Sequence, residues 1–331
     1  TPVKPTFVVP TKLDRTPKQR VKKFTSFSGL SHSHKASLLK KTNPLSKEEP
    51  PLHLALEKEP TQDLWLGLPF GKYVGNLIHE ILENTDFRIF HPFFDSQTKQ
   101  EIWTQEVLQP MCHKYKVGDK KKPTEILQLQ NQVHEIITGL LCTPIQLFDE
   151  SLLLSQFAPK KPFNHSPPGQ KYQVGSYLCE PEFLFPFDKK GTAFVEADIE
   201  GWTQGFIDLV LEKDNHYIIL DWKTNTLPSY DVESLNMAML DHKYEWQAAL
   251  YAKATEQWLN AFPGDSILQG AIYFFVRGAK AARASELSDS GSYVGQACNA
   301  GVWQKNHQDL MPTFAVIQNQ LKLLEADHES L

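Results

Sequence analysis

The sequence predicts an α/β domain in which helices flank a mixed central β-sheet. The supporting pattern is an order of helices, strand, hairpin, helix, strand and helix along the chain. The composition agrees with a folded domain, because 41% of the 331 residues are hydrophobic and 22% are charged. These are ordinary globular values, so we expect a substantial core.

The N-terminal region differs in composition from the rest. Residues 1–50 contain 11 Lys and Arg against three acidic residues, although the whole chain has a net charge of −5. A basic arm of this kind suits contact with nucleic acid, and a solvated linker explains it equally well. Residues 31–66 are polar and contain several prolines, which is typical of a linker. Because the first residue is Thr, we expect a piece excised from a longer protein.

Several segments have the apolar stripe of an amphipathic helix. In KYVGNLIHEILENT the apolar side chains recur at positions 74, 77, 78, 81 and 82. Comparable patterns predict further helices over 97–115, 124–141, 244–262 and 313–328. Strands are predicted over 179–187 and 270–278, and loops over 158–176 and 279–301.

The stretch GFIDLVLEKDNHYIILDWK (205–223) reads as two strands joined by a polar turn. If the loop consists of Asp214 and Asn215, the pairing register places Asp208 directly opposite Asp221. Lys223 then projects from the same face as Asp221, and Trp222 points to the other. A three-residue loop would shift this register.

Two carboxylates that face each other in a sheet repel, which destabilises the strand pair. A divalent cation between them removes this repulsion, and oxygen ligands suit Mg²⁺. The alternative is a surface hairpin with ordinary Asp–Lys ion pairs. The apolar residues of IILDW around the charges favour the metal interpretation.

Other features narrow the functional class. No apolar run approaches the roughly 18 residues of a membrane span, and no signal-peptide core is present at the N-terminus. The four scattered cysteines argue against a zinc or iron–sulfur site and suit a reducing cytoplasm: Cys112, Cys142, Cys179 and Cys298. The chain lacks GxxxxGK[ST], the nearest string being GLPFGKY, so we expect no ATPase motor here.

An acid followed after a spacer by D-x-K resembles the PD-(D/E)xK nuclease signature. Together with KYEWQAALYAKA and GAIYFFVRG in this order, the chain resembles the C-terminal nuclease domain of RecB subunits in RecBCD helicase–nucleases, or exonuclease V. GNLIHEILENTDF is similar to the G-x-x-x-H helix of that family, and FTSFSGLSH to the segment that ends its helicase part. The resemblance covers most of residues 24–303.

The resemblance implies a restriction-endonuclease-like core with an added N-terminal helical region. It divides the chain into the tail of a helicase region (1–30), a linker (31–66) and a RecB-type nuclease domain (67–331). Asp208 and Asp221 match the metal-binding aspartates of the family, Lys223 its catalytic lysine and His79 its active-site histidine, which we expect to complete the metal shell as a neutral imidazole. Without the resemblance, a single helical histidine would be read as a surface or capping residue.

Three further site residues follow from the resemblance. Glu182 matches an acidic residue on the preceding strand and is expected to be a further metal ligand, although Glu180 is two residues away and should point the same way. Gln247 and Tyr251 match a Q-x-x-x-Y helix near the site, and their spacing places them on one helix face. Ordinary packing is the alternative role of this pair.

The implied function is an exodeoxyribonuclease that uses Mg²⁺, or Mn²⁺ as a substitute, on mainly single-stranded DNA. Its implied context is double-strand-break repair by homologous recombination, with RecC-like and RecD-like subunits and RecA as partners and no membrane. The alternatives are a non-catalytic module for RecA loading or RecC docking, and a free-standing Cas4-like exonuclease. Retention of both aspartates and the lysine counts against the first, and the lack of clustered cysteines counts against the second.

Overall fold

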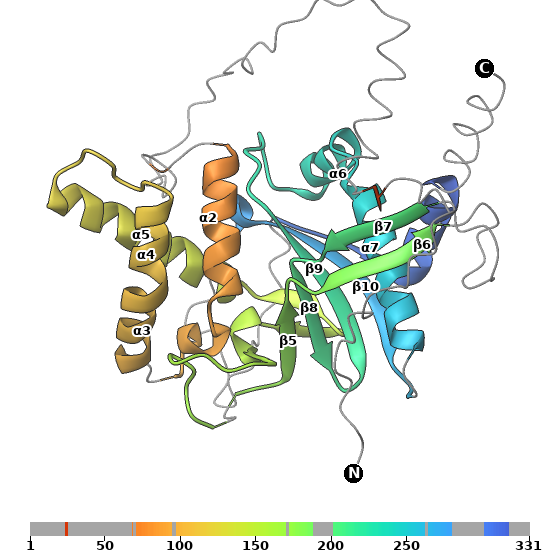
Figure 1. Cartoon of the computed structure of the whole chain (residues 1–331), viewed down its shortest axis with the longest axis horizontal. Coiled ribbons are helices and arrows are strands. Elements are labelled where there is room, and N and C mark those ends of the chain that lie inside the picture. The colour runs from red at the N-terminus through yellow and green to blue at the C-terminus, as the bar shows by residue number, and fades with distance from the viewer. Residues whose placement is uncertain are drawn as a thin grey trace, which may run out of the picture.

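A computed structural model describes residues 24–25, 68, 71–94, 97–169, 172–187, 201–261, 264–279 and 301–317. Its centre is a mixed six-stranded sheet with helices on both faces, which confirms the predicted fold class (Figure 1). The strands in sheet order are β11 (Val302–Asn306), β10 (Ile267–Phe275), β9 (His216–Lys223), β8 (Leu209–Lys213), β5 (Gly175–Cys179) and β4 (Phe157–Pro159).

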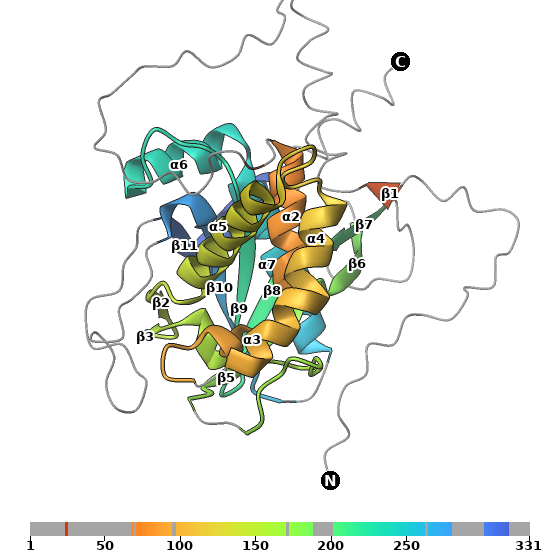
Figure 2. The same ribbon diagram turned by 90° about the vertical axis from the view of Figure 1, so that its left-hand side faces the viewer.

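Helices from two parts of the chain cover the two faces of this sheet. One face is covered by helices that precede the strands: α2 (Lys72–Glu83), α3 (Gln97–Trp103), α4 (Gln109–Lys114) and α5 (Pro123–Leu141). Figure 2 shows α2, α4 and α5 in front of the sheet. On the other face lie α6 (Val232–Asp241) and α7 (Tyr244–Asn260). Each face therefore has its own apolar core, and the sheet separates the two.

The long helices form where the apolar stripes predicted them. All five apolar positions of the α2 stripe are buried, because this face packs on the sheet. The segment predicted as one helix over 97–115 is helical from 97 to 114, with a five-residue π-helix at Thr104–Leu108 between α3 and α4. Helix α5 has Pro at its first position, where the missing N–H costs no hydrogen bond.

The hairpin of β8 and β9 has the predicted register. Leu209 pairs with Leu220 and Lys213 pairs with His216, so the loop is the two residues Asp214 and Asn215. Both loop residues have positive φ, 50° and 65°, as the tight turn of a twisted hairpin requires. The prediction that Asp208 and Asp221 occupy opposite positions follows directly from this register.

The strand prediction is wrong at two points, where one predicted strand is divided between two sheets. Residues 205–212 contain the end of β7 (Gly201–Phe206) and then β8, with a break at Ile207–Asp208. Residues 179–187 contain the end of β5 and then β6 (Glu182–Phe187), with a break at Glu180–Pro181. β6 and β7 pair in a smaller sheet with β1 (Phe24–Thr25). The apolar pattern continues through both breaks, so it gave no sign of them.

Some elements were not predicted, and some predictions lie outside the described residues. Helix α6 and strands β4 and β11 were not predicted, nor was the small hairpin of β2 (Ile145–Leu147) and β3 (Glu150–Leu152). The last helix begins at residue 307 instead of 313 and is described as far as 317. Apart from 24–25, the predicted helicase tail and linker are outside the described residues. Among the described residues, no helix has both the length and the apolar character needed to cross a membrane.

Candidate active site

Helix α2 brings His79 to the end of the hairpin. Its Nε2 lies 3.1 Å from the backbone oxygen of Trp222, and because a carbonyl only accepts, Nε2 carries the proton. Its Nδ1 then faces Asp208, 3.4 Å from Oδ2. A β-carbon on Gly75 would lie 3.2 Å from the Thr224 hydroxyl, so glycine one turn before His79 lets the helix lie close to the strand end.

Asp208 lies at the break between β7 and β8. Its Oδ2 accepts a hydrogen bond from the backbone N–H of Trp222 at 2.8 Å. Burial opposes ionisation of Asp208, yet His79, Lys223 and this N–H outweigh it, so the pKa of Asp208 lies below its usual value. For His79, burial favours the neutral ring, but Asp208 and Asp221 raise its pKa above the usual value.

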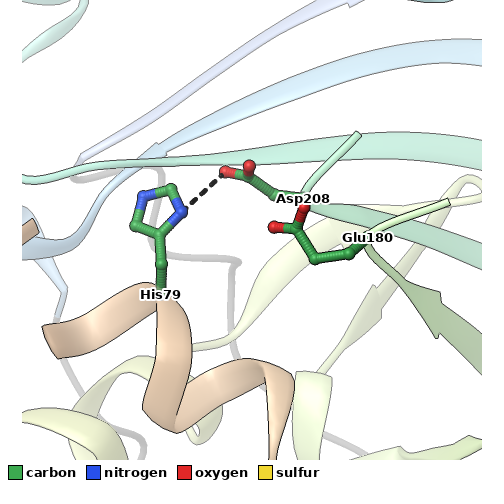
Figure 3. Close-up of side chains that lie close together, drawn as sticks. All are labelled: His79, Glu180 and Asp208. Atoms are coloured by element: carbon green, nitrogen blue, oxygen red, sulfur yellow. Dashed lines mark ion pairs between the residues drawn. The ribbon is translucent and has the colours of Figure 1, made fainter. Parts of the chain in front are cut away.

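Glu180 completes a cluster with these two side chains. One ligand atom from each of His79, Glu180 and Asp208 lies within 4.8 Å of the other two (Figure 3). The break between β5 and β6 makes this arrangement, since Glu180 has a φ of 48° and its N–H donates to the Asp208 carbonyl at 3.1 Å. Burial and then the Asp208 and Glu83 charges raise the pKa of Glu180 to about 7.

Glu182, the acid matched from the sequence, lies outside this cluster. It is exposed at the start of β6, beside a small pocket that Leu178, Phe183 and Trp258 also line. We expected Glu180 and Glu182 to point the same way, which holds only along a continuous strand. Because the chain turns at Glu180, the alternation is interrupted and the two side chains separate.

Asp221 is the most enclosed acid of the site. It is 1% exposed and lies opposite Asp208 in the hairpin, one position beyond the last described pair. Burial, followed by the Asp208 carboxylate, raises the pKa of Asp221 to about 6. Its Oδ1 forms an ion pair with Lys223. The site therefore stores like-charge repulsion that this one lysine only partly relieves.

Lys223 and Gln247 connect the hairpin to α7. The Lys223 ammonium donates to Gln247 Oε1 at 3.2 Å, and Gln247 Nε2 donates to the Tyr251 hydroxyl at 2.8 Å. Burial alone would lower the pKa of Lys223, but Asp221 and Asp208 outweigh burial and raise it. The structure thus brings both members of the predicted Q-x-x-x-Y pair into the surroundings of Lys223.

The donor set fits a hard divalent cation. Two carboxylates and one imidazole nitrogen converge, and Mg²⁺ and Mn²⁺ favour carboxylate oxygens completed by water. A ligating imidazole and carboxylate must be deprotonated, so cation binding competes with protons on His79 and Glu180. Both residues also line an open cleft of about 360 Å³ along α2, together with Asn76, Glu80 and Tyr115. A large substrate can therefore reach them.

One contribution to the site had no signal in the side-chain pattern. The Trp222 ring lies on the face of the sheet opposite to Lys223, where it packs against Phe274, as the alternation predicted. Its backbone N–H and carbonyl hold Asp208 and His79 respectively. Any residue except proline supplies these two groups, so the identity of residue 222 reveals nothing of this role.

This fold and this acid–lysine site define a restriction-endonuclease-like nuclease domain. Residues 71–327 match the family model of the PD-(D/E)XK nuclease superfamily, which covers well over half of the chain. The chain belongs to this superfamily.

The similar proteins are RecB subunits. The chain is 25% identical to the RecBCD enzyme subunit RecB of Chlamydia pneumoniae over 267 residues, which are 80% of this chain and 20% of that protein. It is 34% identical to RecB of Escherichia coli K12 over 230 residues, 63% of this chain and 17% of that one. The chain thus spans about a fifth of the length of these relatives. It is a nuclease domain related to that of RecB.

Proposed function

We propose that this domain is a Mg²⁺-dependent deoxyribonuclease that hydrolyses phosphodiester bonds, mainly in single-stranded DNA. The observation that carries the proposal is the convergence of His79, Glu180 and Asp208 beside the Asp221–Lys223 pair. Buried acids with a purely structural role are usually each paired with a cationic side chain. Here burial and mutual repulsion raise the pKa of Glu180 and Asp221, and such perturbed acids are typical of functional sites.

In the proposed reaction, Glu180, Asp208 and the Nδ1 of His79 would hold the cation, and Asp221 lies opposite Asp208 on the neighbouring strand. The bound cation would neutralise the phosphate charge and lower the pKa of a bound water. Trp222 fixes the ligands through its backbone, because its carbonyl orients the His79 ring and its N–H orients Asp208. The ligands are thereby pre-organised before substrate arrives.

Lys223 is proposed to orient the attacking water and stabilise charge that develops on the phosphate. Its raised pKa keeps it protonated at neutral pH, which suits charge stabilisation better than proton abstraction. Gln247 accepts a hydrogen bond from the Lys223 ammonium, which limits the positions that the ammonium can take. As an ammonium it has no lone pair for a metal, so it acts beside the cation without ligating it.

The relatives supply the proposed context. They are subunits of an enzyme named RecBCD, so we propose that this domain serves a RecBCD-type exonuclease in recombinational double-strand-break repair. RecC-like and RecD-like subunits are then its proposed partners, with RecA as a further one. Mn²⁺ as a substitute for Mg²⁺, and the cytoplasm as location, stay predictions.

The test is cleavage of linear single-stranded DNA by the whole chain, with Mg²⁺ and with EDTA. We expect Mg²⁺-dependent cleavage that EDTA abolishes and that Asp208→Asn lowers by about 10³-fold, as for loss of a group that organises the charge of the transition state. Full activity in EDTA, or in Asp208→Asn, would contradict the proposal. DNA binding without any cleavage would favour the non-catalytic module.

A further inference from the structure

The ammonium of Lys223 lies against two tyrosine rings. Its nitrogen is 4.3 Å from the ring centroid of Tyr244, the first residue of α7, and 5.0 Å from that of Tyr273 on β10. The two rings stack on each other with centroids 5.9 Å apart and planes at 28°. We call Tyr244 and Tyr273 the ring pair. They come from different elements, and both lie against the ammonium of this one lysine.

Each ring is held by stacking and also by a hydrogen bond of its hydroxyl group. Tyr273 is fully buried, and its hydroxyl donates to Gln247 Oε1 at 3.1 Å, the same oxygen that accepts from Lys223. The Tyr244 hydroxyl donates to Asn225 Oδ1 at 3.3 Å. The Tyr244 ring also stacks on His242, with centroids 5.1 Å apart. The ring pair is therefore a rigid surface against which a flexible side chain can rest.

A cation attracts the face of an aromatic ring, and the attraction grows when water is excluded. The Lys223 side chain is only 12% exposed, so these contacts are largely shielded from solvent. Lysine has a long flexible stem, and the ammonium needs contacts on several sides to stay in one place. Asp221 is one such contact, yet a carboxylate that binds a cation has less of its charge to offer Lys223. The ring pair and Gln247 keep their contacts in either case.

We infer that Tyr244 and Tyr273 are positioning residues that hold the Lys223 ammonium beside the metal-binding carboxylates. This inference rests on the proposed function, in which Lys223 acts in the cleavage step. It adds a prediction that the proposed function lacks: removal of a ring lowers the rate of cleavage and leaves DNA affinity and cation affinity unchanged.

The experiment compares Tyr244→Leu with Tyr244→Phe in the whole chain. Tyr244 is the better position because it is partly exposed, whereas Tyr273 lies in the core. We expect Tyr244→Leu to lower single-turnover cleavage about tenfold at saturating DNA and Mg²⁺, with the DNA and Mg²⁺ concentrations for half-saturation unchanged. Tyr244→Phe loses the hydrogen bond to Asn225 but keeps the ring face and its stacking on His242 and Tyr273, so it should stay within about twofold of wild type.

Tyr217→Leu is the matched control. Tyr217 lies on the same face of β9 as Lys223, and its ring meets Trp258 edge-on with centroids 6.0 Å apart. The Tyr217→Leu substitution removes an aromatic contact from the same strand and leaves both rings at Lys223 in place, so cleavage should remain at the wild-type rate. Melting temperatures of all variants are measured on the same preparations. If Tyr244→Leu does not fold, Tyr244→Met replaces it.

A second measurement does not depend on activity. Protons held over a ring face are shifted upfield in NMR spectra, so the terminal methylene of Lys223 should be shifted in wild type and in Tyr244→Phe. The shift should shrink in Tyr244→Leu and remain in Tyr217→Leu. A terminal methylene shift that is the same in wild type and in Tyr244→Leu would contradict the inference, whatever the cleavage rates.

The outcomes also separate this inference from the proposed function. If Lys223→Met cleaves like wild type, the proposed role of Lys223 fails. If Lys223→Met is inactive but Tyr244→Leu cleaves like wild type, the ring pair has no positioning role and the proposed function stands. Loss of DNA or cation affinity in Tyr244→Leu, or equal losses in the Phe and Leu variants, would also overturn the inference. In the Lys223→Met background, Tyr244→Leu should have no further effect.

Discussion

Two buried aspartates near helix α2 differ in how their charge is neutralised. Asp86, just beyond the end of the helix, is fully buried and accepts hydrogen bonds from Arg88 through its N–H at 3.1 Å, Nε at 3.0 Å and Nη2 at 2.8 Å. Asp221 is equally enclosed, but it faces Asp208 and shares a single lysine with it. One acid is neutralised by a dedicated guanidinium, and the other is not.

The two environments indicate two purposes. Arg88 also donates to the Gly169 carbonyl at 3.1 Å and to Gln173 Oε1 at 3.2 Å, so the Asp86–Arg88 pair fastens the long loop before β5 to the helix end. A buried ion pair with its hydrogen bonds made is a structural element. Acids that are buried together without matching cations are costly to the fold, and that cost is understandable where a cation is to bind.

The largest effect should come from removing the charge of Asp208, which contacts Trp222 on β9 and His79 on α2. Asp208→Asn should lower cleavage by about 10³-fold or more while the melting temperature stays within a few degrees of wild type. Its carboxylate is proposed to hold the cation, and its loss relieves repulsion with Asp221 and Glu180. Single-turnover cleavage and thermal unfolding of one preparation measure both. A large loss of stability would place Asp208 in the same structural class as Asp86.

The opposite pattern is expected for the neutralised acid. Arg88→Met leaves Asp86 buried without its partner, which should lower the free energy of unfolding by about 3–5 kcal/mol. Cleavage per folded molecule should be unchanged at a temperature where the variant is folded. Urea unfolding measures the first quantity and single-turnover cleavage the second. If cleavage by Arg88→Met fell by more than its fraction of unfolded molecules, Arg88 would not be purely structural and the comparison would fail.

Lys223→Gln sharpens the comparison between an ion pair that serves catalysis and one that serves the fold. Glutamine keeps a hydrogen-bond donor but removes the charge, so cleavage should fall by about 10²-fold. Cation and DNA affinity should remain. If Lys223 were a structural counter-ion like Arg88, the variant would cleave normally and chiefly melt at a lower temperature.

The two glutamates at the break between β5 and β6 form a matched pair. Glu180→Gln should weaken Mg²⁺ binding by about tenfold or more, as measured by titration calorimetry, because loss of even an outer partner of a metal ligand costs about 10–100-fold. Glu182→Gln, two residues away and outside the cluster, should bind Mg²⁺ like wild type. The reverse result would return the metal site to the residue matched from the sequence.

The smallest effect concerns Asp221 and pH. Its pKa is raised to about 6 in the folded chain, against about 3.9 when unfolded, so the folded state favours the protonated form. That stability is complete below about pH 4 and is lost as the pH rises through about 6. In EDTA at pH 8, Asp221→Asn should therefore melt several degrees above wild type, and the difference should vanish near pH 4. An equal difference at both pH values would contradict this.

The sequence predicted those parts of the site that depend on local periodicity. The two-residue turn and the alternation of β8 and β9 were enough to place Asp208 opposite Asp221 and Lys223 beside it. The stripe of α2 was enough to place its apolar face on the sheet. In each case a short-range pattern with a fixed period determines which way a side chain points.

The remaining parts depend on contacts between distant segments. Glu180 has its positive φ at the point where the chain leaves the β5–β8 pair of the large sheet and enters the β6–β7 pair of the small one. No residue type marks that change. The backbone contacts of Trp222 and the ring pair around Lys223 join α2, α7 and β10 to the hairpin. Such contacts arise only when the layers pack, so periodicity along one segment cannot reveal them.

The most direct test of the central claim is the rise in melting temperature that Mg²⁺ produces in three proteins. At ten times its dissociation constant, a cation that binds only the folded state stabilises it by about 1.4 kcal/mol. We expect this rise in wild type and in Arg88→Met, whose separate defect leaves the cation site intact, and none in Asp208→Asn. An equal rise in Asp208→Asn would show that Asp208 does not hold the cation, and would contradict the account.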